Sequence, residues 1–369
     1  MESLHYYIGF NLAQGIGPVR LRALIEACGD IQQAWEAPVH VLSAAGLDRR
    51  SLESLLATRA SVDLEREVER LAAAGVQAMT WEDSAYPSLL SEVHSPPPLL
   101  YVRGRLEAED AWAVAVVGTR RISAYGRETT RRLAGDLARS GITIVSGLAR
   151  GVDGVAHRAA LDAGGRTIAV LGCGVDQVYP PEHRELARHI MGNGALVSEY
   201  PLGTLPEARN FPPRNRIISG LSMGVLITEA GRRSGALITA DYAAEQGRDV
   251  FAVPGPIFAA GSAGTNRLIQ DGAHVVLETA DILTELNLTM VSEQSQAREV
   301  LPATAVEAAL LSHLSSTPTH VDALGRAVGL PIAEVTSTLA LMELKGMVRR
   351  VEGMTYTTVR EPAPAYKIE

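Results

Sequence analysis

The chain has 369 residues, of which 46% are apolar and 21% charged, and its formal net charge is −8. This length allows two or three domains with at least one sizeable core, and the composition excludes general disorder. Only two cysteines occur, Cys28 and Cys173, which excludes a disulfide framework and a four-thiolate zinc site. The start of the chain has no leader pattern, and prolines and glycines break its longest uncharged stretch (residues 250–266). We therefore expect a cytoplasmic protein without a membrane segment.

The charge is unevenly distributed along the chain. Residues 1–111 carry a net charge of −7, residues 112–279 carry +3 and residues 280–369 carry −4. All 18 cations of the middle segment are arginines, whose planar guanidinium groups can grip phosphate and stack on bases. Arginine-biased codon usage would produce the same pattern. The acidic total therefore does not exclude nucleic acid as a partner of the middle segment.

The first segment is predicted to be helical, and we place a small helical domain (SAM-like or helix-hairpin-helix-like) at residues 1–80. Its Gly15-Ile16-Gly17 turn precedes a helix that starts at Val19, as in modules that offer backbone N–H groups to DNA phosphates. A purely structural role of this domain is the alternative. Residues 81–111 form a proline-rich connector with a short strand at residues 99–102.

The middle segment alternates strands and helices. We expect strands at residues 113–117, 142–146, 167–171, 196–198, 224–228, 250–253 and 274–277, with helices between them. Continuous apolar strands joined by helical crossovers are typical of a parallel sheet covered on both faces. The sequence therefore predicts a doubly wound, Rossmann-like, mostly parallel α/β domain at residues 112–285.

The last segment begins after a polar linker (286–301) and ends in a short tail (361–369). Between them, residues 302–360 contain three predicted helices and a hairpin, which is the winged-helix plan. The third helix lacks the basic side chains that duplex reading needs. This favours protein contact or self-association, and DNA contact through Arg349 and Arg350 is the alternative.

Small, hydroxylic and arginine residues follow almost every predicted strand of the middle segment. Ligands of doubly wound sheets bind beyond the carboxyl ends of the strands, where glycines and helix N-termini present N–H groups to anions. The predicted anion-binding residues at the first two strands are Gly118, Thr119, Arg120, Ser146, Gly147 and Arg150. Ser234, Gly235 and Thr239 follow the fifth strand. The phosphate-loop and dinucleotide-binding glycine patterns are absent, so we expect no nucleotide cofactor.

Several residues allow a catalytic as well as a structural interpretation. Cys173 follows a strand, as a nucleophile would, but also fits a tight turn. Glu199 and Glu229 are candidate general bases, or carboxylates that orient arginines. His157 is expected to be packed rather than to ligate, and the histidines show no metal-binding spacing.

Side chains suited to binding an anion are most concentrated in residues 206–220, the segment before the fifth strand. It combines Arg209, Arg214 and Arg216 with Asn215 and with Phe211, one of only four phenylalanines. Cations at the start of a helix are poorly placed unless an anion joins them. Arginines around an aromatic side chain are typical of single-stranded nucleic-acid sites. The alternative places Phe211 in the core and pairs Arg214 and Arg216 with Glu199 and Glu229.

These motifs, in this order, resemble the DprA/Smf DNA-processing family. The residues that carry the resemblance are 118–120, 146–157, 178–180, 211–222, 229–240, 247–255 and 268–273. The resemblance implies a cytoplasmic homodimer that binds single-stranded DNA taken up in natural transformation, protects it and helps to load RecA, without being an enzyme. It also implies DNA contacts at Arg120 and in the loop that holds Arg209 and Phe211, with Arg209 in place of a lysine found in some relatives. The self-association surface would include Leu268 and Ile269.

Two other functions remain as alternatives. A phosphoribohydrolase-like enzyme would use the same strand ends with Glu229 as its base, although the Pro-Gly-Gly-x-Gly-Thr-x-x-Glu signature of such enzymes is absent. A transcriptional regulator would act through the winged helix.

Overall fold

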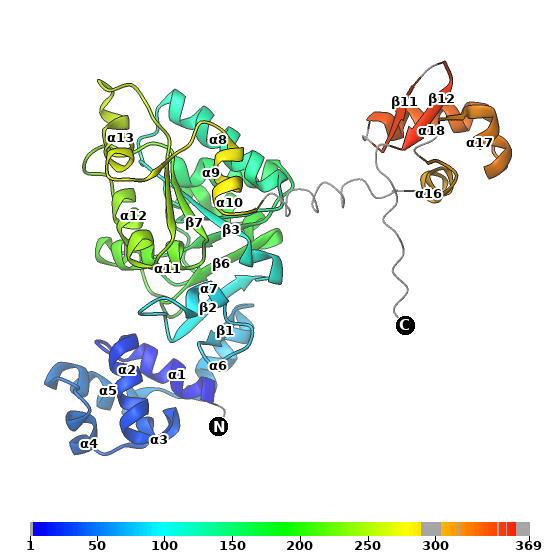
Figure 1. The fold of residues 1–369 in the computed structure, drawn as a ribbon. Coiled ribbons are helices and arrows are strands. Elements are labelled where there is room, and N and C mark those ends of the chain that lie inside the picture. The colour runs from blue at the N-terminus through cyan, green and yellow to red at the C-terminus, as the bar shows by residue number, and fades with distance from the viewer. Residues whose placement is uncertain (1–2, 289–303, 316–317, 345–346, 352, 359–369) are drawn as a thin grey trace. The chain divides into compact units, whose positions relative to one another are not determined.

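The computed structural model describes residues 3–288, 304–315, 318–344, 347–351 and 353–358. Its contacts divide the chain into two compact units, residues 1–292 and 293–369, which we describe separately (Figure 1). The predicted linker (286–301) lies almost entirely outside the described residues, and the predicted tail (361–369) lies wholly outside them.

A nine-stranded sheet forms the centre of the first unit. Its order is β1-β2-β6-β5-β4-β3-β7-β8-β9. The seven strands from β6 to β9 in this order are parallel, and only β1 and β2 are antiparallel. The strands are β1 (Gln77–Thr80), β2 (Leu99–Gly104), β3 (Ala113–Val117), β4 (Thr143–Ser146), β5 (Thr167–Val170), β6 (Gly194–Ser198), β7 (Gly224–Ile227), β8 (Asp249–Ala252) and β9 (His274–Val275). The predicted mostly parallel sheet is confirmed. Residues 77–80, at the end of the predicted helical domain, form its edge strand β1.

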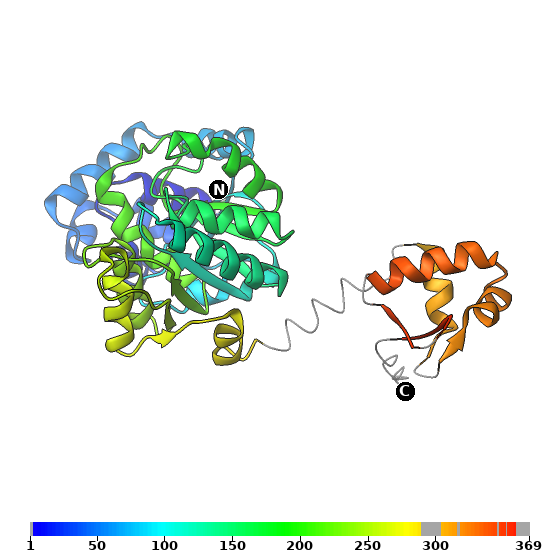
Figure 2. The same cartoon turned by 90° about the horizontal axis from the view of Figure 1, so that it is seen from above.

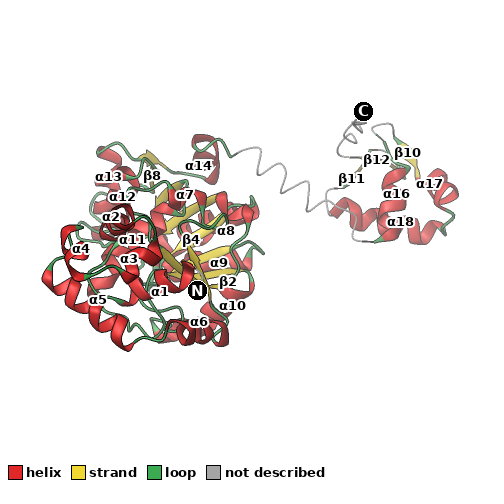
Figure 3. Ribbon diagram, turned by 90° about the horizontal axis from the view of Figure 1, so that it is seen from below, coloured by secondary structure: helices red, strands yellow, loops and turns green. Residues whose placement is uncertain are grey.

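Helices cover both faces of this sheet, as Figure 2 shows from above and Figure 3 from below. One face packs against α7 (Ser88–Ser91), α11 (Phe211–Gly220), α12 (Ala236–Glu245) and α13 (Ala263–Gln270). The other face packs against α8 (Ala124–Arg139), α9 (Val152–Asp162), α10 (Arg184–Gly192) and α14 (Thr279–Glu285). All five residues of β3 are buried. A strand covered on both faces has no polar side, which explains its uninterrupted apolar sequence.

The N-terminal helices pack against the antiparallel end of the sheet. They are α1 (Ser3–Leu12), α2 (Pro18–Cys28), α3 (Ile31–Glu36), α4 (Val39–Ala44), α5 (Arg49–Ser61) and α6 (Leu64–Ala73). Their core continues into β2 through Leu99 and Tyr101. The Tyr101 hydroxyl donates a hydrogen bond to Asn11 Oδ1 (3.0 Å), and Asn11 Nδ2 donates to the Glu199 carbonyl (3.1 Å). The helices and the sheet therefore share one compact unit.

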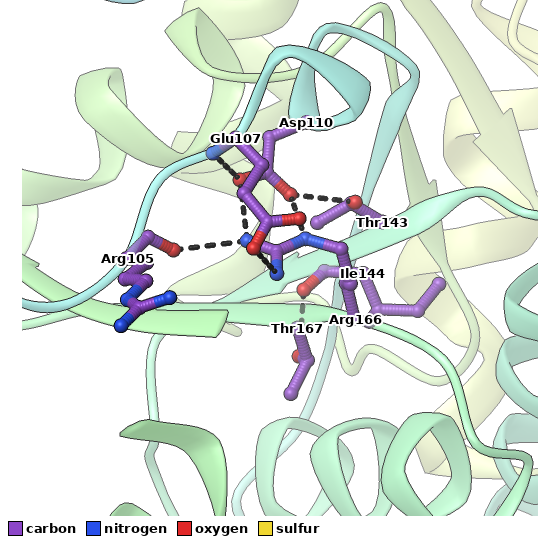
Figure 4. A network of polar contacts seen from close by, with 7 residues as sticks. All are labelled: Arg105, Glu107, Asp110, Thr143, Ile144, Arg166 and Thr167. Atoms are coloured by element: carbon purple, nitrogen blue, oxygen red, sulfur yellow. Dashed lines mark hydrogen bonds and ion pairs between the residues drawn. The ribbon is translucent and has the colours of Figure 1, made fainter. Parts of the chain in front are cut away.

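A polar network fastens the connection between β2 and β3 to the starts of β4 and β5 (Figure 4). Arg166 donates two hydrogen bonds to the Asp110 carboxylate, both 2.8 Å, and Thr143 donates a third to it, also 2.8 Å. Arg166 also pairs with Glu107 at 3.1 Å. These contacts fix the amino-terminal edge of the sheet, opposite the edge where its ligands are expected.

The second unit has the winged-helix plan. It consists of α16 (Ala305–Ser312), β10 (Thr319–His320), α17 (Val321–Val328), α18 (Ile332–Leu344), β11 (Val348–Arg350) and β12 (Thr355–Thr358). The strands form a sheet in the order β10-β12-β11, and a small core contains Leu310, Leu324 and Leu339. The Arg349 and Arg350 side chains are exposed on β11. Lys345, which the sequence places at the end of the third helix, and Glu352, which it places in the hairpin turn, lie outside the described residues.

Candidate nucleic-acid interface

A pocket of about 550 Å³ opens beyond the carboxyl ends of β3 and β7. These two strands are neighbours in the sheet, yet the chain leaves β3 towards β4 on one side and leaves β7 towards β8 on the other. This is a topological switch point, where the connections diverge and leave a crevice. The pocket therefore lies where a doubly wound sheet places its ligands.

Nine of the predicted site residues line this pocket. They are Gly118, Thr119, Arg120, Phe211, Arg214, Asn215, Ser234, Gly235 and Thr239. Gly147 and Arg150 border a smaller adjoining cavity that also touches Arg120 and Phe211. The fold thus brings together residues from four segments that lie up to about 120 positions apart in the sequence.

Phe211 lies between charged and aromatic side chains. The Arg120 Cζ atom is 5.5 Å from its ring centroid and the Arg214 Cζ atom is 5.7 Å from it. The Tyr179 ring lies 5.7 Å away, tilted by 38°. Cations over an aromatic face are attracted by its quadrupole. Phe211 therefore holds Arg120 over the pocket and is not part of the apolar core that the alternative interpretation required.

Arg214 is buried and fixed by backbone carbonyls. Its Nη1 donates to the carbonyl oxygens of Gly147 (2.8 Å) and Val170. Its Nε has no hydrogen-bond partner among the described residues. Burial lowers the pKa of Arg214 to about 10, so the guanidinium stays charged at neutral pH. Arg214 therefore contributes a fixed positive charge to the floor of the pocket.

Arg120 is exposed at the mouth of the pocket, in a loop that Glu229 anchors. The Thr119 N–H donates to the Glu229 carbonyl (2.7 Å). The Ser123 N–H and hydroxyl donate to the Glu229 carboxylate at 2.9 and 3.1 Å. Glu229 is only 7% exposed and does not line the pocket. Its role is to position the loop, which leaves it badly placed as the base of a nucleotide hydrolase.

Three predicted contact residues lie outside both cavities. Arg216 forms an ion pair with Glu199 at 2.5 Å, in which both side chains are about one-sixth exposed. Burial raises the pKa of Glu199 although Arg216 opposes it. Arg209 is exposed and pairs with Glu207 at 2.7 Å. Ser146 is fully buried and donates its hydroxyl hydrogen bond to the Val116 carbonyl (2.7 Å). For Arg216, the geometry therefore fits the alternative interpretation of the sequence, in which this arginine pairs with a carboxylate such as Glu199.

Cys173 and His157 are structural residues. Cys173 donates to the Gln177 carbonyl at 3.1 Å, and burial raises the pKa of its thiol to about 11, so it is a poor nucleophile at neutral pH. His157 is fully buried and its Nδ1 lies 2.7 Å from the Thr167 hydroxyl. Burial lowers its pKa to about 3, so the imidazole is neutral at neutral pH.

Tyr179 and Asp153 also line the pocket, although neither was among the predicted site residues. Asp153 is in the first turn of α9 and accepts a hydrogen bond from the Ala149 N–H (3.2 Å). Burial raises its pKa, and the nearby Arg214 opposes this shift. The signal for both residues was their place inside the family motifs.

One group of potential metal ligands occurs among the described residues: Asp249, His274 and Glu285. His274 Nε2 is 3.6 Å from Asp249 and its Nδ1 is 3.6 Å from Glu285. Each ring nitrogen thus lies near a different carboxylate, so the imidazole stands between Asp249 and Glu285. The three residues come from two strands and a helix, which explains why no sequence spacing revealed them.

Comparisons with known proteins identify the family. The protein-family model described as DNA recombination-mediator protein A matches residues 77–287. The chain belongs to the DprA family. The DprA winged helix domain matches residues 294–354. The Smf protein of Synechocystis is 36% identical over 95% of this chain and 98% of its own length, and the Smf protein of Escherichia coli is 45% identical over 73% and 74%.

Two solved DprA structures share the fold. DprA from Streptococcus pneumoniae is 36% identical, with a TM-score of 0.68 over 76% of this chain and 97% of its own. DprA from Helicobacter pylori is 33% identical, with a TM-score of 0.52 over 57% and 96%, and its structure concerns a single-stranded DNA binding mode. In the described part of this DprA family member, no helix is both long and apolar enough to cross a bilayer.

Proposed function

We propose that this DprA family member binds single-stranded DNA in the pocket at the β3–β7 switch point. The observation that carries the proposal is the placement of exposed Arg120 over Phe211, above the buried charge of Arg214. Single-stranded nucleic acid is typically held by cations along its backbone and by aromatic side chains against its bases. The single-stranded DNA binding of the related Helicobacter pylori protein supports the same substrate.

Each pocket residue has a distinct proposed role. Arg120 pairs with a phosphate, and Gly118, Thr119, Ser234 and Gly235 offer backbone and hydroxyl donors to neighbouring phosphate oxygens. Thr239 and Asn215 supply polar side chains on the opposite wall. Phe211 and Tyr179 face the base. Arg214 attracts the strand electrostatically from below, while Arg216 and Ser146 only support the walls, because their polar groups are engaged elsewhere.

Replacing Arg120 tests this site. For Arg120→Ala we expect at least about 10-fold weaker binding of a fluorescent oligo-dT, because one charge-assisted phosphate contact is lost. A plot of the logarithm of the association constant against the logarithm of the salt concentration has a negative slope. The magnitude of this slope should decrease by about 0.7, the value for one phosphate of a single strand. Fluorescence anisotropy over a salt series measures both quantities.

Arg132→Ala is the matched control, since Arg132 is 71% exposed on α8 and does not line the pocket. It should keep the wild-type affinity. Equal affinity of the Arg120 variant and the wild type would contradict the site assignment.

We further propose that the bound strand is protected and handed to RecA, and that the protein acts as a homodimer and not as an enzyme. Leu268 and Ile269, the proposed dimer contacts, are half-buried on α13, the helix that precedes the edge strand β9 in the chain. RecA filament formation on single-stranded DNA should be faster with the wild type than with Arg120→Ala. The double variant with Leu268→Glu and Ile269→Glu should be monomeric, so light scattering should give half the wild-type mass. A monomeric wild-type protein would contradict the proposed homodimer. Equal rates of RecA filament formation with the wild type and Arg120→Ala would contradict the proposed handover to RecA.

A further inference from the structure

The loop that follows β8 carries two strongly exposed apolar side chains. Ile257 is 80% exposed and Phe258 is 95% exposed, more than any other large apolar residue in the described part of the chain. They occupy the two central positions of a turn closed by the Ala259 N–H and the Pro256 carbonyl (3.0 Å). Such positions usually hold polar residues or glycine. An aromatic ring at this tip gains nothing for the fold, which points to a ligand.

The base of this loop is held rigidly. Asn266 Nδ2 donates to the Gly255 carbonyl (2.9 Å), and the Gly255 N–H donates back to Asn266 Oδ1 (3.1 Å). The Gly264 N–H donates to the Ala230 carbonyl (2.7 Å). Phe258 is therefore presented by an ordered scaffold, which is the usual construction of a binding loop.

The Phe258 loop lies on the same edge of the sheet as the pocket. β3, β7 and β8 are parallel neighbours, so the loops after their carboxyl ends adjoin. The Tyr125 hydroxyl donates to the Pro254 carbonyl (3.1 Å), which joins the first turn of α8 to this loop. Tyr125 is itself 53% exposed. A chain leaving the pocket past β7 would therefore meet Tyr125 and Phe258.

Three exposed arginines stand next to pocket residues in the sequence. Arg232 and Arg233 immediately precede Ser234 of the pocket, and Arg121 follows Arg120. Among the described residues no carboxylate pairs with any of the three, whereas Arg131, Arg132 and Arg139 on α8 all have carboxylate partners. A patch of unpaired cations attracts a polyanion. A second copy of the chain would bring the same cations against one another, which favours nucleic acid as the occupant.

We propose that Arg121, Tyr125, Arg232, Arg233 and Phe258 form a second subsite for single-stranded DNA, in which Phe258 stacks on a base. This subsite extends the proposed pocket and rests on the proposed function. The strand runs from the β3–β7 pocket across the end of β7 to the β8 loop. The arginines hold its phosphates, and Phe258 supplies a stacking surface that does not depend on base identity.

A length series of oligo-dT tests the subsite with the full chain. For Phe258→Ala we expect wild-type affinity for the shortest oligomers and at least about fivefold weaker binding of longer ones, because one stacked base is lost. Arg120→Ala should weaken binding at every length. Val39→Ala is the control, since Val39 is 47% exposed on α4, among the N-terminal helices.

A direct readout comes from Phe258→Trp. Its fluorescence, after subtraction of the signal of the three native tryptophans, should be quenched by long oligo-dT and not by short oligo-dT. No quenching, together with unchanged affinity of Phe258→Ala at all lengths while Arg120→Ala weakens binding, would overturn the subsite and leave the pocket intact. Unchanged binding by Arg120→Ala would instead reject the proposed function. A loss of affinity that accompanies a change in mass would assign Phe258 to an interface between copies and overturn the subsite.

Discussion

At the scale of single residues, burial distinguishes side chains of the same type around the pocket. Arg120 and Arg214 both face Phe211, but one is exposed and the other is 3% exposed and bonded to carbonyls. The same residue type thus serves once as a proposed ligand contact and once as a fixed charge. Arg216 lies two residues after Arg214, and its charge is neutralised by the ion pair with Glu199.

His157 makes stability depend on pH. Its pKa is lowered from 6.5 to about 3 in the folded protein, because the charged imidazolium would be buried. The unfolded chain therefore takes up a proton below pH 6.5 that the native state does not, and the free energy of unfolding falls as the pH drops from 6.5 towards 3. The loss approaches about 1.4 kcal/mol per pH unit, the value for one proton.

Urea unfolding between pH 7 and pH 4.5 measures this loss. His157→Gln should lower stability at pH 7 but show a flatter decline with acid. His189→Gln, at an exposed position, is the control variant and should retain the wild-type slope. An identical slope for His157→Gln and the wild type would refute the assignment.

At the scale of elements, the approach of two loops positions Arg120. Gly151 precedes α9 with φ +79°, and a side chain there would clash with the Thr119 carbonyl and lie 2.8 Å from the Arg120 Cα atom. The close contact between the β3 and β4 loops therefore requires the absence of a Cβ atom. This explains a glycine that the sequence showed only as part of a motif.

Gly151→Ala should consequently affect the site as well as the fold. We expect a loss of about 1–3 kcal/mol from backbone strain and a further weakening of oligo-dT binding, because the Arg120 loop must move. Gly164→Ala is a matched control: its φ is +76°, but its Cβ would meet nothing within 4 Å. Thermal unfolding and anisotropy should show that both variants lose stability and only Gly151→Ala loses affinity. Equal affinity of the two variants would contradict this account.

At the scale of the whole molecule, the division into two compact units separates the proposed DNA site from the winged helix. The pocket lies entirely within residues 1–292. The two exposed cations of β11, Arg349 and Arg350, belong to the other unit, and Arg350 donates to the Gly353 carbonyl. The middle segment also carries the only positive net charge of the three segments.

Residues 1–292 should therefore bind oligo-dT within about twofold of the full chain at matched salt, because all proposed phosphate contacts are retained. Anisotropy with both proteins tests this. A loss of 10-fold or more on truncation would show that the winged helix contacts DNA, and Arg349→Ala with Arg350→Ala in the full chain should then reproduce that loss.

The sequence by itself determined the order and type of the parallel strands with the helices between them, and the winged-helix plan of the last segment. Apolar strands such as residues 113–117 alternate with helices, and burial on both faces leaves no other arrangement for them. It also determined the loops that end the strands and nine pocket residues, because parallel strands bring their carboxyl ends to one edge.

Only the tertiary structure decided which of the chemically similar residues face that edge. Arg214 and Arg216 are two positions apart, yet helical geometry turns one below Phe211 and the other towards Glu199. Glu229 could be assigned to the Ser123 loop, and Tyr179 to the pocket, only once distant segments of the chain were placed together. The antiparallel strands β1 and β2, which join the N-terminal helices to the sheet, likewise depend on pairing between distant segments, which no local pattern specifies.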